Sequence, residues 1–230
     1  LASIGYETVL GSRSASRAQE IRDGLVEKYP QVGDLLGCGD NPTAAECELI
    51  VMATPWDSAA PMAHTLADQL AGKIVISMAN ALIRVGGEFE PLIPPRGSVA
   101  AHVQAAAPDS KVVAAFHHLP AKELGQIDHP IDSDVLICGD DQAAVDEVCE
   151  LVDQFPGCRP LDAGELSNAT AIEAFTAVLL QLNVRYKTRV AVKFTGRVGG
   201  GGRVVGARCR EGGGAGARRR PPRRGGGGGG

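Results

Sequence analysis

The chain has 230 residues and a formal net charge of −4, and 44% of its residues are hydrophobic while only 4% are aromatic. This length suits one domain, or one domain with a small second one. The low aromatic content argues against a surface that stacks nucleic-acid bases, and no apolar run approaches the roughly 18 residues of a membrane span.

Charge and glycine separate the chain into two parts. Residues 196–230 contain nine Arg, one acidic residue (Glu211) and 16 of the 30 Gly, so residues 1–195 carry 14 basic and 26 acidic residues, a net charge of −12. The Gly/Arg-rich tail has little apolar surface to bury, and we expect it to be disordered. We interpret it as an artefact at the end of a damaged gene, with an RNA-binding segment as the alternative.

The six cysteines are widely spaced and form no CxxC pair. This usage is typical of a reduced cytoplasmic protein and not of a disulfide scaffold or a zinc site. No signal peptide is visible, and the histidines and cysteines show no spacing for metal ligands. We therefore expect a cytoplasmic protein without a metal site.

Strands and helices alternate through the first half of the chain. Ser14 or Ser16 is expected to cap the first helix, and Asp57 the second, while Pro55 stops the apolar strand before it. A short helical turn is expected at residues 44–45. The predicted strands of this half are residues 7–11, 49–53 and 73–77, and the predicted helices are residues 14–29 and 57–70.

The second half continues the alternation. Asp140 or Asp141 is expected to cap a helix, and Asp162 to cap the turn that follows it in the sequence. The predicted strands are residues 111–116 and 135–139 with an extended segment at 159–161, and the predicted helices are residues 97–106, 140–154 and 166–184. This order predicts an α/β fold with a Rossmann-like, doubly wound, mostly parallel sheet and a small carboxyl-terminal α/β cap.

Three regions follow from this reading. We expect a Rossmann-like domain in residues 1–110, a smaller carboxyl-terminal domain in residues 111–195, and the tail in residues 196–230. The long helix of residues 166–184 carries a broad apolar stripe, which we interpret as a homodimer contact, with packing against the chain's own sheet as the alternative.

A histidine pair follows the most apolar strand. The run at residues 112–116 leads into His117 and His118, and Pro120 ends the strand because it cannot donate to a ladder. In an open α/β sheet ligands bind at this edge, so His117 is a candidate binding residue, or a strand-end histidine that bonds to backbone. We expect His118 to lie behind the site or at the surface.

A second candidate group follows the first strand. Ser12, Arg13 and Arg17 supply a hydroxyl and two cations, with no acid there to accept the ribose 2′-OH of NAD. This combination favours the 2′-phosphate of NADP, although solvent-exposed arginines are the simpler alternative. No GxGxxG sequence occurs before the tail, so the usual glycine-rich phosphate loop is missing.

Residues 1–195 resemble the coenzyme F420-dependent NADP oxidoreductases, which use a deazaflavin. The order and spacing of the matching segments hold over nearly 200 residues, and the run that begins at Arg159 is the most distinctive. The segments are Val9-Leu10-Gly11-Ser12-Arg13, Ala53-Thr54-Pro55-Trp56, Lys73-Ile74-Val75-Ile76-Ser77, the strand before His117, Cys138-Gly139-Asp140-Asp141, Arg159-Pro160-Leu161-Asp162-Ala163-Gly164 and Leu166-Ser167-Asn168.

The resemblance implies hydride transfer between NADP and coenzyme F420, with no protein acid or base. It implies contacts of Ser12, Arg13 and Arg17 with the 2′-phosphate. A cleft around the pyrophosphate and nicotinamide would be lined by Thr54, Pro55, Trp56, Met78 and Ala79, and the reacting rings would be positioned by His117 and Leu119, with Ala121 nearby. Trp56 could instead be core filler.

The family begins with a strand, a glycine-rich turn and a helix, and the match here begins after them. We therefore expect an amino-terminally truncated fragment that binds NADP weakly and has lost the strand between those at residues 7–11 and 49–53. The alternatives are another NADP-dependent reductase on the same fold, acting on an imine, a hydroxy acid, a flavin or a metal, and an inactive pseudogene product.

Overall fold

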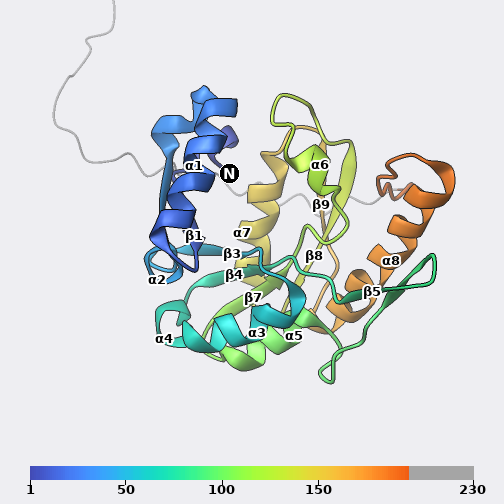
Figure 1. Cartoon of the computed structure of the whole chain (residues 1–230). Coiled ribbons are helices and arrows are strands. Elements are labelled where there is room, and N and C mark those ends of the chain that lie inside the picture. Colours follow the sequence, from blue (N-terminus) through green and yellow to red (C-terminus); the bar gives the residue numbers. More distant parts are fainter. Residues whose placement is uncertain (197–230) are drawn as a thin grey trace, which may run out of the picture. The chain divides into compact units, whose positions relative to one another are not determined.

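The computed structural model describes residues 1–196, which form one compact unit. The expectations for the Gly/Arg-rich tail beyond residue 196 lie outside the described residues. Within the described part, no helix is both long and apolar enough to cross a membrane. Figure 1 shows α1 (Ala15–Lys28) on one side of this unit and α8 (Ala169–Tyr186) on the opposite side.

A five-stranded sheet forms the centre of the fold, and all its neighbouring strands are parallel except β7 and β8. Its order is β3 (Leu49–Met52), β4 (Ile74–Ser77), β7 (Lys111–Ala114), β8 (Ser133–Gly139) and β9 (Cys158–Asp162). The sequence-based expectation of a mostly parallel α/β sheet is confirmed. In register, Met52 pairs with Ser77, and Ser77 pairs with Ala114. The carboxyl ends of these three strands therefore lie at one edge.

Helices cover both faces of this sheet, as continuous apolar strands require. Val75 and Val112 pack on one face with residues of α3 (Trp56–Thr65), α5 (Val99–Ala106) and α8. Ile76 and Val113 point to the other face and pack with residues of α7 (Gln142–Asp153). The alternation of neighbouring residues between two cores follows from the two-residue period of a strand.

A separate two-stranded parallel sheet holds β1 (Thr8–Ser12) and β2 (Leu36–Asp40). The sequence analysis missed β2, because Leu-Gly-Cys-Gly-Asp has no apolar run. Its glycines are explained by the close approach of α2 (Asn41–Ala44). A Cβ atom on Gly39 would lie 2.7 Å from the Cβ of Thr43, and one on Gly11 would lie 2.8 Å from the Cβ of Ala44.

An antiparallel hairpin lies beside α8, in a part of the chain to which the sequence analysis assigned no element. It consists of β5 (Leu82–Val85) and β6 (Glu88–Pro91), joined at Gly86, which has a φ of 60°. The amide of Phe89 donates to the Gln181 side chain at 3.3 Å. The hairpin was missed because its strands are short and carry charged residues on exposed positions.

The helix caps expected from the sequence are confirmed for α1 and α7 and wrong for α3. Ser14 caps α1 and Asp141 caps α7, where its carboxylate accepts from the Ala144 amide at 2.9 Å. Asp57 does not cap α3: the helix starts at Trp56 and Asp57 lies in its first turn. The expected helix through Leu70 is divided at Leu66, where α4 (Ala67–Leu70) begins. Another short helix, α6 (Ala121–Leu124), follows Pro120.

Candidate active site at the carboxyl ends of the strands

The sequence-predicted site residues lie at the carboxyl ends of strands or after them. Ser12 ends β1, and Arg13 and Arg17 come directly after it. Thr54 and Pro55 follow β3, and Trp56 begins α3. The remaining residues follow β4 and β7 and are Met78, Ala79, His117, Leu119 and Ala121. Because β3, β4 and β7 are parallel and in register, the last two groups meet at one edge of the five-stranded sheet.

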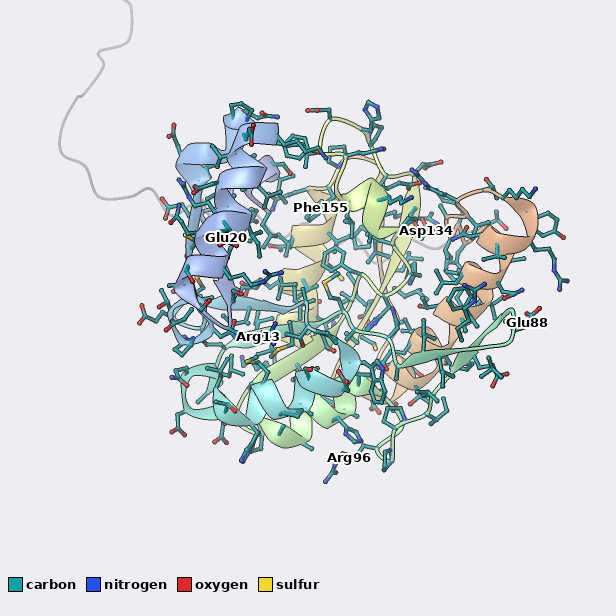
Figure 2. The ribbon with its side chains drawn as sticks, viewed as in Figure 1. Arg13, Glu20, Glu88, Arg96, Asp134 and Phe155 are labelled. Atoms are coloured by element: carbon teal, nitrogen blue, oxygen red, sulfur yellow. The ribbon has the colours of Figure 1, made fainter. Side chains whose placement is uncertain are left out.

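Arg13 and Arg17 form the basic part of this region. Both side chains are exposed, and neither takes part in a salt bridge among residues 1–196. The first turn of α1 holds no acidic residue, so the positive end of the helix dipole adds to the cationic field. Figure 2 shows Arg13 at the end of α1 nearest the strands β3 and β4.

One acid lies near this basic group, and the sequence analysis overlooked it. Asp40 pairs in register with Ser12 across the β1–β2 ladder. Its carboxylate accepts bonds from the Thr43 hydroxyl at 2.6 Å and the Thr43 amide at 2.9 Å, and these bonds lower the pKa of Asp40. Asp40 is thus committed to capping α2, and the salt bridges found in residues 1–196 give neither arginine a carboxylate partner.

The loop after β3 exposes an aromatic ring and encloses a hydroxyl. Trp56 is 38% exposed, so the alternative of a tryptophan that fills the core is wrong. The Thr54 hydroxyl is buried without a hydrogen-bond partner. The Ser77 hydroxyl at the end of β4, which pairs in register with Met52, is also buried and unpartnered.

His117 is part of the loop after β7, and its side chain lies in the interior. It is only 3% exposed, and neither ring nitrogen has a hydrogen-bond partner. Burial, with a smaller contribution from the neighbouring His118, lowers the pKa of His117 to about 3, against an opposing effect of the Ala79 backbone. The ring is therefore neutral near pH 7. Because Leu119 is also buried, at 8% exposure, contact of either side chain with a cofactor requires this loop to move.

The carbonyl of His117 is held from two other elements, a feature that sequence reasoning missed. Asn80 Nδ2 donates to His117 O at 2.9 Å. The Thr176 hydroxyl of α8 lies 3.1 Å from the same oxygen and 3.2 Å from Asn80 Oδ1. Just before this point, Phe116 has a φ of 64°, a conformation that costs free energy for a bulky residue. The two side chains hold the strained turn in place.

His118 lies behind the site, and the alternative of a surface position is wrong, since it is 4% exposed. Its Nε2 is 2.8 Å from the carbonyl of Asp134 on β8. The Asp134 carboxylate accepts from Arg159 Nε at 2.8 Å and from the Phe194 amide at 2.6 Å, and these bonds, that with Arg159 above all, keep the pKa of Asp134 low. Figure 2 shows Asp134 on the side of the sheet near α8.

Glu173 is a buried acid to which the sequence gave no role. It is 5% exposed on α8, and its carboxylate accepts from the amides of Val99 and Ala100 at 2.7 and 3.0 Å. Those amides are free donors at the start of α5. Burial nevertheless raises the pKa of Glu173 to about 7, against the lowering effect of the two amides. Glu173 thus fixes α8 to α5 beside the site.

All five unpartnered buried side-chain atoms found in residues 1–196 lie at this edge. They are Thr54 Oγ1, Ser77 Oγ, His117 Nδ1, His117 Nε2 and His118 Nδ1. Buried polar atoms are normally satisfied, and a group of them without partners calls for a specific explanation. A polar ligand at the carboxyl edge of β3, β4 and β7 provides one, because ligands of α/β sheets bind there.

Comparison with known proteins points to one family. The family model described as NADP oxidoreductase, coenzyme F420-dependent, matches residues 1–81. The F420-dependent NADP reductase of Methanocaldococcus jannaschii is 34% identical over 186 residues, which cover 79% of this chain and 83% of that protein. The enzyme of the same name from Methanothermobacter thermautotrophicus is 28% identical over 195 residues, covering 83% of this chain and 84% of that protein.

Solved structures agree with this result at the level of the fold. A crystal structure described as an F420-dependent NADP-reductase, from Arthrobacter sp. FB24, matches with a TM-score of 0.67 and 23% identity, and covers 84% of this chain and 91% of that one. Together with the sequence identity to the archaeal enzyme, these findings establish that the chain belongs to the F420-dependent NADP reductase family.

Proposed function

We propose that this chain is an oxidoreductase that transfers a hydride between NADP and coenzyme F420. The observation that carries the proposal is the position of the candidate residues, which lie at the carboxyl ends of β1, β3, β4 and β7 or after them, together with the unpartnered polar atoms at that edge. Membership of the family supplies the identity of the two cofactors.

The residues present fit the two cofactors. Ser12, Arg13 and Arg17 offer a hydroxyl and two cations for a 2′-phosphate, and Thr54 offers a hydroxyl that has no partner within residues 1–196. Pro55, Trp56, Met78 and Ala79 would line the nicotinamide side, while His117, Leu119 and Ala121 would border the deazaflavin. When both are bound, the nicotinamide and the deazaflavin supply the hydride chemistry, and the protein supplies position and exclusion of water.

A neutral His117 suits this role. With its pKa at about 3, the ring is neutral at pH 7 and does not serve as a general acid, but it can donate one hydrogen bond from its ring N–H. Reduction of coenzyme F420 by NADPH takes up one hydride and one proton; the hydride comes from the nicotinamide and the proton can come from solvent, so no acid or base of the protein is required. We therefore assign His117 and Leu119 to positioning, with the first 110 residues forming the NADP side and residues 111–195 the deazaflavin side.

The direct test of the proposal is loss of the visible absorbance of oxidised coenzyme F420 when NADPH and the protein are added. NADPH with a flavin, an imine, a 2-oxo acid or a ferric chelate tests the second candidate function, another NADPH-dependent reductase on the same fold. Turnover of any of these in place of coenzyme F420 would refute the proposal. Absence of turnover with every acceptor, with no cofactor bound, would instead indicate an inactive protein.

Thr176 should be a positioning residue for the deazaflavin side. Thr176→Val keeps the shape and removes the hydroxyl near His117 O, and one net hydrogen bond corresponds to roughly a 2- to 10-fold change. We expect a loss of this size in kcat with coenzyme F420, an unchanged KM for NADPH, and recovery in Thr176→Ser. Equal losses in both variants, or a change confined to thermal stability, would contradict this role.

We also propose a homodimer in which α8 is the contact. Phe175, Val178, Val184 and Tyr186 are between 39% and 67% exposed on this helix, and exposed apolar clusters on a soluble fold mark interaction surfaces.

The free thiols found in the described residues, with no disulfide among them, support a cytoplasmic location.

Val178→Glu should convert the dimer to a monomer, because the substitution places a charge in a dehydrated contact. Ile21→Glu is the matched control, since Ile21 is 43% exposed on α1, away from α8. Size-exclusion chromatography with light scattering gives the mass. A dimer that survives Val178→Glu, or a wild-type chain that is already monomeric, would rule out this contact.

A further inference from the structure

We infer that Asn80 sets the spacing between the two reacting rings, because its side chain ties the loop after β4 to the loop after β7. The inference rests on the proposed function, which assigns residues 78–79 to the nicotinamide and the loop that holds His117 and Leu119 to the deazaflavin. Asn80 acts through the backbone of His117, so it is a positioning residue.

The two loops leave the sheet side by side. β4 and β7 are parallel neighbours, and their last paired residues are Ser77 and Ala114. The Ala115 amide still donates to the Ser77 carbonyl at 3.1 Å. Within residues 1–196, no further backbone hydrogen bond connects residues 78–80 with residues 116–119. Beyond the sheet, the spacing of the two loops therefore depends on side chains.

Both polar atoms of the Asn80 side chain are used at this junction. Its Nδ2 donates to His117 O at 2.9 Å, and its Oδ1 lies 3.2 Å from the Thr176 hydroxyl. That hydroxyl is also 3.1 Å from His117 O, but it has a single hydrogen to offer to the two oxygens. Asn80 is therefore the dedicated donor to the carbonyl, and Thr176 supports it.

The carbonyl of His117 is a place where such a bond has a large effect. Phe116, just before it, has a φ of 64°, which costs free energy for a bulky residue, so the turn needs an external hold. The Leu119 amide closes this turn on the carbonyl of Phe116 at 3.2 Å. A shift of the His117 carbonyl therefore moves the His117 ring and Leu119 together, relative to the loop after β4.

Hydride transfer is sensitive to a small change of this spacing. The reacting atoms must lie roughly 3–3.5 Å apart, and a misplacement of about 1 Å costs roughly 100-fold in rate. Asn80 belongs to the nicotinamide loop by its position in the chain and holds the deazaflavin loop by its hydrogen bond. Its removal should therefore change the rate of transfer and leave the binding of NADPH unchanged.

Asn80→Leu keeps the size of the side chain and removes both polar groups. We expect kcat with coenzyme F420 to fall roughly 10- to 100-fold, with an unchanged KM for NADPH and faster hydrogen exchange of the Leu119 amide. Gln104→Leu is the matched control, because the Gln104 amide bonds to the Ser110 carbonyl at 3.0 Å and accepts from the Val112 amide at 3.1 Å at the other end of β7. It should lower the melting temperature without changing kcat or the exchange of Leu119.

Asn80→Asp supplies a rescue that a loss of packing would not show. At pH 8 its carboxylate cannot donate to the His117 carbonyl, so kcat should be at least as low as in Asn80→Leu. A protonated carboxyl can donate as the amide does. The ratio of its kcat to that of the wild type should therefore rise several-fold from pH 8 to pH 5.5, while the ratio for Asn80→Leu stays constant. The ratio removes the titration of His117 and of Glu173, which lies one turn before Thr176 on α8, because all these proteins share both groups.

The outcomes separate this inference from the proposed function. A wild-type protein that does not reduce coenzyme F420 with NADPH would overturn the proposed function and this inference with it. An active wild type with unchanged kcat in Asn80→Leu, or an equal loss of kcat in Gln104→Leu, would overturn the inference alone. Circular dichroism verifies folding, and if Asn80→Leu does not fold, the pH dependence of Asn80→Asp decides: a constant ratio to the wild type refutes the role of Asn80.

Discussion

Glu173→Ala is expected to lower the free energy of unfolding by roughly 2–4 kcal/mol, because it leaves two buried amide donors without a partner. For a protein of this size, this corresponds to a fall of roughly 4–16 °C in melting temperature. Glu147→Ala, at an exposed position of α7, is the matched control and should change the melting temperature little. A Glu173→Ala protein that melts with the wild type would show that the contact between α8 and α5 contributes nothing.

The same carboxyl should make stability depend on pH in a defined direction. The pKa of Glu173 is raised from 4.5 to about 7, so between these values the folded state holds more protons than the unfolded state, and stability falls as the pH rises. At about 1.4 kcal/mol per pKa unit, the loss is roughly 3 kcal/mol across this window.

Glu173→Gln isolates this contribution from those of other groups. His117 acts in the opposite sense, since its pKa is lowered to about 3 and its burial costs stability as the pH falls below 6.5. The difference in unfolding free energy between Glu173→Gln and the wild type should therefore increase in favour of the variant from pH 4.5 to 7. A difference that is constant over this range, measured by urea unfolding at each pH, would refute the assignment.

Arg13→Ala is expected to reduce kcat/KM for NADPH by roughly 10- to 150-fold, the equivalent of the 1.5–3 kcal/mol of a hydrogen bond to a charged group. The expectation follows from the position of Arg13 after β1, with no carboxylate partner among the described residues. Because a 2′-phosphate is remote from the reacting ring, the loss should appear mainly in KM, with kcat nearly unchanged.

NADH serves as the internal comparison, since it lacks the 2′-phosphate. Arg13→Ala should leave kcat/KM for NADH within about twofold, so that the preference for NADPH collapses. Arg96→Ala, in the loop before α5, is the matched control arginine and lies away from Arg13 in Figure 2. Equal losses with NADPH and NADH would mean that Arg13 has a structural role and does not contact the phosphate.

The sequence was sufficient to predict the elements whose burial is uniform. The strands around Ile76 and Val113 are apolar at every position because helices cover both faces, and such runs are readable without a structure. By contrast, β2 is made of small residues selected by the approach of α2, and the contact with Thr43 that explains Gly39 cannot be seen in a linear pattern.

The residues of the candidate site also fall into those that the sequence could predict and those that it could not. Arg13 comes one residue after β1 and Thr54 two residues after β3, so the rule that ligands bind at the carboxyl ends of strands locates both. Asn80 and Thr176 are 96 positions apart in the chain, yet their side chains are hydrogen-bonded to each other and both bond to the carbonyl of His117. No periodicity connects a loop after one strand with a helix at the far end of the chain, and their shared role becomes visible only when the coordinates bring them together.

Hydrogen bonds of Asp134 connect the segment after α8 to His118, which lies behind the candidate active site. Its carboxylate holds the Phe194 amide, and its backbone amide donates to Val192 O at 2.7 Å, while its carbonyl lies against His118. Nicking the backbone near Lys193 by limited trypsin digestion would release this strap and leave a buried anion with Arg159 as its main counterion. The imidazole pair would then report the cut as altered histidine signals in an NMR spectrum.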